Sequence, residues 1–389
     1  MEVNNIMRII ILANKYPNKI EPNVNVFTQQ IAWSMCDQGA EVIVICPLAV
    51  NYKKKYSEFE AVREEITESN KVIKIYHPRY IGFGQNGNFL LKSRVKATTA
   101  LYINAVDSVL SKIIQHDDIL FAEFLCPAGV AASKLGKKYR VKAFMQCGEA
   151  TYQGDRRYGN QYLEKALRSL TGVVALSGQN KKYFTDAGIV KAEKIIILPS
   201  GYRKDRIYQR DKTVSREKFG LPTDKFIVGF CGSFDDRKGI LRLEKAIDGI
   251  DDEDIVLAAC GKGKMSPTTE KLVWKGPINH KDLGFFYSAL DVFAFPTYNE
   301  GCCTAIVEAI ACGCPIISSD RSFNKEICDE TNSILIEPDD IHAMKESILA
   351  LKNNPEYRNK LSMGSLAKGK ELSLDDKAYR LLQYFCSKE

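Results

Sequence analysis

Residues 291–315 of the chain read DVFAFPTYNEGCCTAIVEAIACGCP. The apolar run at 292–295 predicts a short strand buried on both faces, and the apolar stretch at 304–312 predicts a helix. The turn between them is polar and glycine-containing, Gly313 suits a left-handed helix C-cap, and Pro315 prevents the helix from continuing. A buried strand followed at once by a helix is the repeating unit of a parallel α/β sheet.

The same alternation of strand-like and helix-like segments extends through the first half of the chain. Helices are expected at 26–37, 90–114 and 128–138. Short Val/Ile-rich runs predict strands at 8–13, 41–46, 72–75, 119–121, 143–146, 173–176 and 195–198. Nearly continuous apolar strands joined by helices indicate a parallel sheet that is covered on both faces.

The alternation stops at residues 199–213, a highly charged segment without apolar periodicity, which we interpret as an interdomain linker. After it, strands are expected at 226–231, 255–259, 292–295, 316–318 and 334–336. The predicted fold class is α/β, with two Rossmann-like, doubly wound parallel-sheet domains in series. A length of 389 residues suits two domains.

The composition is ordinary for a soluble globular protein, with 45% hydrophobic and 26% charged residues. No apolar run approaches the roughly 18–20 residues that span a bilayer, and the opening MEVNNIMRIIILANKYP is typical of a first β-strand. We therefore expect a cytoplasmic protein. The 12 cysteines form no CxxC pair, so reduced and mostly buried thiols are expected. The net charge of +7 fits a phosphate-rich ligand, an anionic membrane or nucleic acid equally well.

Ligands of doubly wound sheets bind outside the carboxyl ends of the strands, so the residues directly after each strand are candidates. Gly232 follows the strand at 226–231 and lets the backbone turn sharply toward a ligand, and Ser233 comes next. Arg237 and Lys238 precede the next expected helix, where exposed amides and the helix dipole also favour an anion. The loop therefore predicts a phosphate site, the alternative being that its charged residues pair only among themselves.

Two glutamates are associated with the strand–turn–helix unit at 291–315. Glu300 lies in the turn, and Glu308 lies about one turn inside the helix. Helical side chains lean toward the helix N-terminus, which aims Glu308 at the turn that holds Glu300. Two carboxylates there can accept hydrogen bonds from a polyhydroxylated ligand such as a sugar or a ribose. The spacing alone fits equally well an alternative in which Glu300 caps the helix and Glu308 is a surface residue of it.

The stretch at 299–315 resembles the signature of family 4 retaining glycosyltransferases (glycosyl transferases group 1), which have the GT-B fold. Further motifs at 16–17, 198–201, 237–239 and 291–296 extend the resemblance over essentially the whole chain. It implies two Rossmann-like domains that face a central cleft. An acceptor-binding domain is expected at 1–205, a nucleotide-sugar-binding domain at 206–372, and a terminal helix that crosses back to the first domain at 373–389.

The resemblance also implies a role for each candidate residue. Glu300 would bind hydroxyl groups of the donor sugar, and Glu308 would hold the nucleotide ribose. Lys238 and Arg237 would neutralise the donor diphosphate, and the loop that contains Ile278 would contact the base through its backbone. The expected donor-binding set is Gly232, Ser233, Arg237, Lys238, Ile278, Glu300, Gly301, Cys302, Cys303, Thr304 and Glu308.

For the reaction, the resemblance implies catalysis by Glu300, Lys238 and Arg237. Positive charge around the diphosphate stabilises the departing nucleotide. A donor phosphate oxygen would accept the proton of the acceptor on the same face of the sugar, so no protein nucleophile is needed. No metal and no separate cofactor are expected, because the nucleotide-sugar is a co-substrate and no Asp-x-Asp pair stands at a strand end.

Four positions depart from the family pattern. Cys147 stands where a histidine is usual, so Glu149 or a neighbour would substitute for it, or the donor sugar differs. Asn25 replaces a glycine and tolerates left-handed backbone geometry. Ser233 replaces an arginine, and the acidic residue usual after the 198–201 motif is displaced. The expected residues on the side of the first domain are Asn25, Cys147, Gly148 and Glu149.

The acceptor is expected to be a glycan or a lipid-linked glycan of cell-surface polysaccharide biosynthesis, such as capsule or O-antigen. Basic residues of the first domain would meet an anionic membrane at its inner face, or else simply face solvent. They are Lys15, Lys19, Lys53, Lys54, Lys55, Lys92, Arg94 and Lys96. No nucleic-acid partner is expected, because no clustered basic-aromatic motif occurs.

The sequence therefore predicts a retaining glycosyltransferase of the hexosyltransferase type that uses a UDP-sugar in preference to a GDP-sugar. A non-catalytic nucleotide-sugar-binding homologue and a GT-B nucleotide-sugar epimerase stay open as alternatives. The glycine- and lysine-rich stretch at 261–266 does not have the GxxxxGK[ST] spacing of a P-loop, which excludes that class of nucleotide site.

Overall fold

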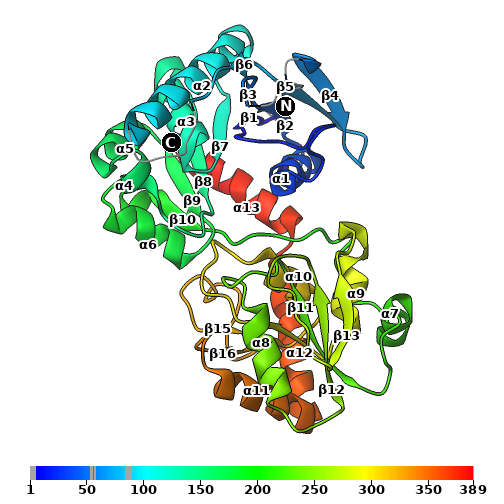
Figure 1. The fold of residues 1–389 in the computed structure, drawn as a ribbon. Coiled ribbons are helices and arrows are strands. Elements are labelled where there is room, and N and C mark those ends of the chain that lie inside the picture. The colour runs from blue at the N-terminus through cyan, green and yellow to red at the C-terminus, as the bar shows by residue number, and fades with distance from the viewer. Residues whose placement is uncertain (1–5, 53–55, 57, 84–89, 389) are drawn as a thin grey trace. The chain divides into compact units, whose positions relative to one another are not determined.

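The computed structural model describes residues 6–52, 56, 58–83 and 90–388 (Figure 1). The chain folds as two compact units: Met1–Leu198 with Ala378–Glu389, and Pro199–Lys377. Each unit contains its own parallel sheet with helices packed against it. The prediction of two doubly wound α/β units is therefore confirmed.

The first unit contains an eight-stranded sheet in the order β10-β9-β8-β7-β1-β2-β5-β4, in which only β4 is antiparallel to its neighbour. β3 and β6 form a separate two-stranded sheet. The strands are β1 (Arg8–Leu12), β2 (Glu41–Ile45), β3 (Leu48–Ala49), β4 (Val62–Ile66), β5 (Val72–Tyr76), β6 (Arg79–Tyr80), β7 (Ile119–Glu123), β8 (Lys142–Cys147), β9 (Gly172–Ala175) and β10 (Ile195–Ile197).

Helices connect these strands and cover the sheet. They are α1 (Val26–Asp37), α2 (Leu91–Ile113), a turn of π-helix η2 (Leu125–Gly129), α3 (Val130–Tyr139), α4 (Gly154–Arg157), α5 (Asn160–Leu167), α6 (Gly178–Asp186), the 3₁₀ turn η3 (Ala192–Lys194) and the terminal α13 (Leu374–Ser387). Alternate residues of β1 point to opposite faces of the sheet. On one face, Ile10 and Leu12 pack in a core cluster with Val95 of α2 and Leu135 of α3. This is the period-2 alternation of a strand buried on both faces.

The second unit has a six-stranded, all-parallel sheet in the order β13-β12-β11-β14-β15-β16. Its strands are β11 (Phe226–Cys231), β12 (Ile255–Cys260), β13 (Leu272–Gly276), β14 (Val292–Phe295), β15 (Ile316–Ser319) and β16 (Ser333–Ile336). Its helices are α7 (Lys212–Phe219), α8 (Ile240–Asp248), η4 (His280–Asp282), α9 (Leu283–Ala289), α10 (Thr304–Ala311), α11 (Ile341–Asn353) and α12 (Pro355–Gly369). Gly313, with φ of 78°, ends α10 in the left-handed region, as predicted.

The interpretation of residues 199–213 as a linker needs correction, because the segment is packed into the second unit. The amide of Tyr202 donates to the carbonyl of Leu372 at 3.1 Å, and the Leu374 amide donates to Tyr202 at 2.9 Å. Ile207 is fully buried in the core of that unit, and α7 begins at Lys212. The boundary lies between Leu198 and Pro199, a few residues before the expected 205/206. The sequence did not reveal this packing, because one buried apolar residue, Ile207, in a charged segment produces no apolar periodicity.

Strands β3, β4, β6 and β13 were not predicted. β3 and β6 are only two residues long. β4 is the edge strand of its sheet and alternates between exposed and half-buried residues, and β13 has no fully buried side chain. The terminal helix α13 begins in the second unit and continues as part of the first, to which Ala378–Glu389 belong. Its Phe385 is fully buried, with ring centroids 4.5 Å from Phe144 and 5.2 Å from Phe121.

Candidate functional site

The topology of the second unit brings two predicted loops together. From β11 the chain proceeds to β12 on one side, and later places β14 on the other side of β11. The loops that follow β11 and β14 are therefore neighbours at the carboxyl edge, where doubly wound sheets bind ligands. The amide of Tyr298 and the hydroxyl of Thr297 both donate to the carbonyl of Arg237, at 2.9 and 3.0 Å. These bonds join the two loops directly.

Glycines allow the backbones of these loops to approach closely. Gly239 has φ of 85°, and a Cβ at this residue would lie 2.3 Å from the carbonyl oxygen of Pro296. Gly261, after β12, has φ of 147°, and a Cβ there would lie 1.9 Å from the carbonyl oxygen of Gly232. Only glycine combines these φ values with such contacts. Gly232 itself donates its amide to Cys260 at 2.9 Å.

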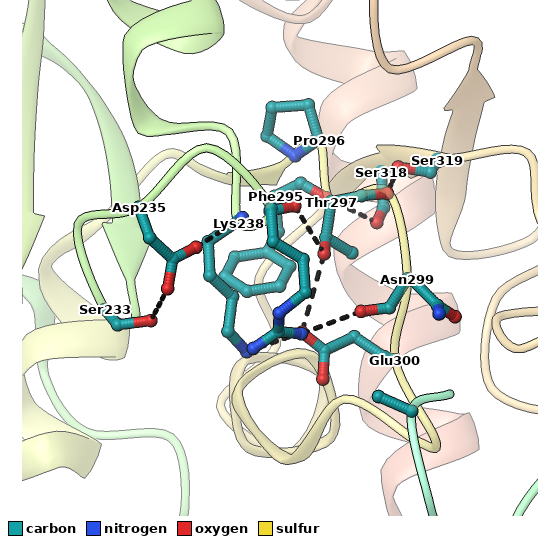
Figure 2. A network of polar contacts seen from close by, with 12 residues as sticks. Ser233, Asp235, Lys238, Phe295, Pro296, Thr297, Asn299, Glu300, Ser318 and Ser319 are labelled. Atoms are coloured by element: carbon teal, nitrogen blue, oxygen red, sulfur yellow. Dashed lines mark hydrogen bonds and ion pairs between the residues drawn. The ribbon is translucent and has the colours of Figure 1, made fainter. Parts of the chain in front are cut away.

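Glu300 forms the centre of the site and contacts both predicted cations. Its Oε1 lies 2.6 Å from Nη1 of Arg237 and 2.5 Å from Nζ of Lys238. Glu300 is buried and the Lys238 side chain largely so, whereas Arg237 is 41% exposed. Figure 2 shows Glu300 and Lys238 pointing toward one another from different loops. A carboxylate between two cations provides acceptors for hydroxyl groups next to donors for phosphate.

A set of buried hydroxyl groups, which the sequence analysis did not identify, supports the turn that carries Glu300. Thr297 is fully buried, and its carbonyl accepts from the Ser319 hydroxyl at 2.5 Å. Ser318 donates to the carbonyl of Phe295 at 2.8 Å, and Asn324 donates to Ser318 at 3.1 Å. Figure 2 shows these serines on the far side of Thr297 from Lys238. The sequence feature that could have indicated these hydroxyl groups is the pair Ser318–Ser319 at the end of a buried strand.

Ser233 and Asp235 organise the loop after β11. Asp235 Oδ1 accepts from the Lys238 amide at 2.9 Å, and its other oxygen accepts from the Ser233 hydroxyl. Burial acts to raise the pKa of Asp235, but these hydrogen bonds and the nearby cations bring it below the ordinary value. Asp235 is therefore charged and holds the backbone of the loop in place through these hydrogen bonds. The ammonium group of Lys238 is hydrogen-bonded to Glu300, which lies in the other loop.

The residues before α10 contribute backbone groups. Cys303 is the N-cap residue, and its side chain makes no capping hydrogen bond to the first-turn amides, of which that of Ile306 donates to the Cys303 carbonyl at 3.1 Å. Cys303 and Gly301 are buried, and Thr304 is exposed. The thiol of Cys302 accepts from the amide of Ser200 at 3.3 Å, an anchor within the second unit.

Glu308 has a different set of partners from Glu300. It is buried, its Oε2 accepts from the Tyr287 hydroxyl at 3.0 Å, and its Oε1 lies 3.3 Å from Nε2 of His280. The hydrogen bond to Glu308 raises the pKa of His280 above 6.5, although burial acts to lower it. Burial raises the pKa of Tyr287 well above 10, so Tyr287 is a neutral donor. The structure thus brings Glu300, Arg237 and Lys238 together and gives Glu308 its own contacts.

His280 and Tyr287 were not identified from the sequence. His280 begins η4, two residues after Ile278, and Tyr287 lies on α9. The backbone of Ile278 hydrogen-bonds the Cys260 thiol at the end of β12. The loop with Ile278 is therefore held at the carboxyl edge of the sheet, next to the segment that carries His280. A lone histidine after a loop gives no sequence signal, because its partner is 28 residues away.

In the first unit, Cys147 needs correction as a ligand-facing residue. It is the last residue of β8, fully buried, and packs in the core with Ala143 and Met145, which lie on the same face of the strand. A Cβ on Gly148 would lie 2.4 Å from Cδ1 of Leu176, so this glycine permits close packing. Glu149 is turned inward: its Oε1 accepts from the Leu125 amide at 2.9 Å, and its Oε2 has no partner among the described residues. Burial raises its pKa.

Asn25 has the left-handed geometry expected of a glycine replacement, with φ and ψ of 44°. It lines a cavity in the first unit at the carboxyl ends of β1, β2 and β7. Asn14, directly beyond β1, ties this edge together: its side-chain amide donates to the carbonyls of Glu123 and Cys126 and accepts from the Ala128 amide. The described part of the chain contains no helix that is both long and apolar enough to cross a membrane.

Residues 211–365 match the family model of glycosyl transferases group 1. The chain carries a glycosyl transferases group 1 domain. The putative teichuronic acid biosynthesis glycosyltransferase TuaC of Bacillus subtilis (strain 168) is 24% identical over 353 residues, 88% of each chain. This domain and this relative, itself named a glycosyltransferase, bear out the predicted glycosyltransferase class.

Solved structures share the fold. Sucrose-phosphate synthase from Thermosynechococcus elongatus superposes with a TM-score of 0.75 at 18% identity over 98% of both chains. Anabaena HepE, solved in complex with UDP, gives a TM-score of 0.74 at 14% identity over 98% of this chain and 100% of that chain. The GT-B fold is therefore confirmed.

Proposed function

We propose that this glycosyltransferase moves a sugar, with retention, from a nucleotide-sugar to a glycan or lipid-linked glycan in cell-surface polysaccharide biosynthesis. A UDP-sugar is favoured over a GDP-sugar. The name of TuaC, which refers to teichuronic acid biosynthesis, supports the polysaccharide, and the UDP complex of HepE supports the nucleotide. Capsule and O-antigen are the polysaccharide classes proposed.

The observation that carries this proposal is the convergence of Arg237 and Lys238 on Glu300 at the switch point of the second unit. Two cations at one end of a helix, with loop amides beside them, suit a diphosphate. A carboxylate in contact with both cations lies where hydroxyl groups of the attached sugar would bind. A nucleotide-sugar has this combination of a diphosphate and a hydroxyl-rich group.

In the proposed reaction, Lys238 and Arg237 stabilise the negative charge that develops on the departing diphosphate. Glu300 gives up part of its contact with them to accept hydrogen bonds from the sugar. A donor phosphate oxygen accepts the acceptor's proton, so no side chain acts as nucleophile. We propose that the two cations fulfil the role that a divalent metal has in other transferases, and that no metal or separate cofactor is required.

The nucleoside would occupy the other end of the same sheet edge. Glu308, fixed by Tyr287 and His280, is proposed to bind the ribose hydroxyls, and the loop at Ile278 to contact the base. The amides of residues 301–304 are proposed to complete the donor site. Separate partner sets for Glu300 and Glu308 suit a ligand with hydroxyl groups on both sides of a pyrophosphate.

Substitution of Lys238 and Glu300 tests the proposal. Lys238→Ala removes one charged contact to the diphosphate, so we expect at least about a tenfold weaker affinity for UDP in calorimetry. Glu300→Gln keeps the size of the side chain but removes its charge. We expect about a hundredfold lower turnover of UDP-sugars, measured by release of UDP.

Lys245→Ala is the matched control, because Lys245 is exposed on α8 outside the site. Unchanged UDP affinity in Lys238→Ala would refute the diphosphate role of Lys238. A wild-type chain that binds UDP but never turns over a nucleotide-sugar would instead favour the non-catalytic homologue. Interconversion of two UDP-sugars without transfer would favour the epimerase.

We propose further that the enzyme is cytoplasmic and contacts an anionic membrane peripherally. Lys92 is exposed on α2, and Lys96 on the same helix is half-buried. Phe83, 44% exposed, donates a hydrogen bond from its amide to the Thr98 hydroxyl of that helix. An exposed apolar ring close to basic side chains favours an interfacial contact. Lys53, Lys54 and Lys55, which were expected to contribute, lie outside the described residues. Failure to cosediment with anionic vesicles at low salt would contradict this contact.

A further inference from the structure

The first unit contains its own cavity at a topological switch point. From β1 the chain proceeds to β2 on one side and later places β7 on the other. A cavity of about 480 Å³ lies at the carboxyl ends of these strands, and Asn14, Cys46 and Phe124, which follow them, line it. This volume is within the range of ligand sites, roughly 300–1,000 Å³.

Aromatic rings form much of the wall and are fixed in place. Tyr80 packs edge-on against Tyr102 with 5.8 Å between ring centroids, and Phe124 packs edge-on against Phe27 at 5.6 Å. The Tyr52 hydroxyl donates to the carbonyl of Phe83 at 2.7 Å. Rings with fixed orientation present an apolar face, and tyrosines add a polar edge. This combination suits a pyranose ring, which has both CH groups and hydroxyl groups.

Backbone strain is concentrated at the rim of the same cavity. Phe124 has φ of 70° with ψ of 160°, a region that is essentially confined to glycine, and Asn25 has φ of 44°, which asparagine tolerates better than most residues. Strained residues cluster at functional sites. Phe124 on the wall of this cavity therefore indicates a site whose geometry is maintained at the expense of stability.

The charge of the lining is positive. Lys15 and Arg157 line the cavity, and neither forms an ion pair with any described residue. Among the described residues that line the cavity, Glu21 is the one carboxylate, and it accepts a hydrogen bond from the Tyr56 hydroxyl. In addition, α1 begins beside the cavity at Asn25 without a side-chain cap and without an acidic residue in its first turn. The N-terminal end of the helix dipole favours an anion there, in support of the two cations.

We infer that this cavity binds the acceptor through a sugar ring that bears an anionic substituent, either a carboxylate or a phosphate. The inference rests on the proposed glycosyl transfer, because only then does the first unit receive an acceptor. The aromatic rings pack against the ring of the acceptor sugar. Lys15 and Arg157 pair with its anionic group.

Binding of small probes to the full chain tests this assignment. Methyl β-D-glucuronide carries a carboxylate, glucose 6-phosphate carries a phosphate, and methyl β-D-glucoside is neutral. We expect the wild-type chain to bind one anionic probe at least about fivefold more tightly than the neutral one, measured by calorimetry or ligand-observed NMR. The tighter of the two anionic probes identifies the substituent.

The double variant Lys15→Gln/Arg157→Gln is expected to lose this preference and still bind the neutral probe. Lys165→Gln, an exposed lysine on α5 outside the cavity, is the control with a matched charge change and should behave as wild type. Equal affinity for all three probes, or an anionic preference that survives in the double variant, would overturn the inference. UDP binding, measured on the same samples, distinguishes a failure of the proposed donor site from a failure of the proposed acceptor site. Absence of UDP binding would contradict the donor site in the second unit, whereas the three sugar probes test the acceptor site in the first unit.

Discussion

At the scale of single residues, His280 links the nucleoside end of the site to pH. Its Nε2 faces the buried carboxylate of Glu308, and Arg203 and Arg206 are the nearby cations. The hydrogen bond to Glu308 raises the pKa of the imidazole above 6.5, while burial and the two arginines act in the opposite direction. Because the folded pKa is raised, the pair stabilises the fold fully below about pH 6.5, and this contribution is lost as the pH rises through the folded pKa.

We therefore expect His280→Gln to destabilise the second unit more at pH 5.5 than at pH 9. The imidazole is 43% exposed, so solvent screening limits the difference to at most about 1 kcal/mol. Urea denaturation at both pH values measures it. His342→Gln, which replaces an exposed histidine on α11, is the control. A constant difference between wild type and His280→Gln across this range would show that the ion pair contributes no stability.

At the scale of elements, the loops after β11 and β14 depend on close backbone contact. Gly239 combines φ of 85° with a carbonyl oxygen that would lie 2.3 Å from its Cβ, whereas Gly220, with φ of 62°, ends α7 with nothing within 4 Å. Both positions need a left-handed residue, but only Gly239 also needs the space. Alanine variants at Gly220 and Gly239 therefore distinguish the free-energy cost of the left-handed backbone from the additional cost of the steric clash.

We expect Gly220→Ala to lower the free energy of unfolding by about 1–2 kcal/mol, the cost of a left-handed alanine. Gly239→Ala should cost more than this and should also weaken UDP binding, because the displaced loop carries Arg237 and Lys238. Denaturation and calorimetry on both variants measure the two effects. Equal loss of stability in the two variants would mean that the loop relaxes without strain.

At the scale of the whole molecule, α13 joins segments that are far apart in the sequence, as the expectation of a helix that crosses back to the first domain requires. Ala378–Glu389 follow the second unit in the chain but fold with the first. Phe385 is fully buried there against Phe121 and Phe144, while Tyr379 on the same helix is 51% exposed. The stability of the first unit therefore depends on residues that follow the second unit in the chain.

Phe385→Ala is expected to destabilise the first unit by about 3–5 kcal/mol, the usual cost of truncating a buried aromatic residue, and to leave the second unit unchanged. Scanning calorimetry with and without UDP assigns the transitions, because a ligand raises the transition of the unit that binds it. Tyr379→Ala is the control on the same helix. A shift confined to the UDP-sensitive transition would contradict the assignment of residues 378–389 to the first unit.

Much of the fold and part of the site could be predicted from local patterns. The strands that are buried on both faces were found because they are continuous apolar runs, as at 226–231 and 292–295. Glu300, Arg237 and Lys238 were found because they directly follow such strands. The edge strand β4 and the packed segment at 199–213 were missed, because a partly exposed strand and a single buried isoleucine have no strong period.

By itself the sequence determined the α/β class, the two units, the carboxyl-edge position of the candidate residues and, through the motif at 299–315, the glycosyltransferase family. The class, the units and the carboxyl-edge position follow from the period of apolar residues or from residues adjacent in the chain, and the family follows from the resemblance of that motif to a known signature. Only the tertiary structure decided that His280 and Tyr287 hold Glu308, that Cys147 packs into the core, that Glu149 turns inward, and that Phe385 closes the first unit. These outcomes depend on side chains that are distant in sequence and meet only after the sheets have formed, and no local pattern contains that information.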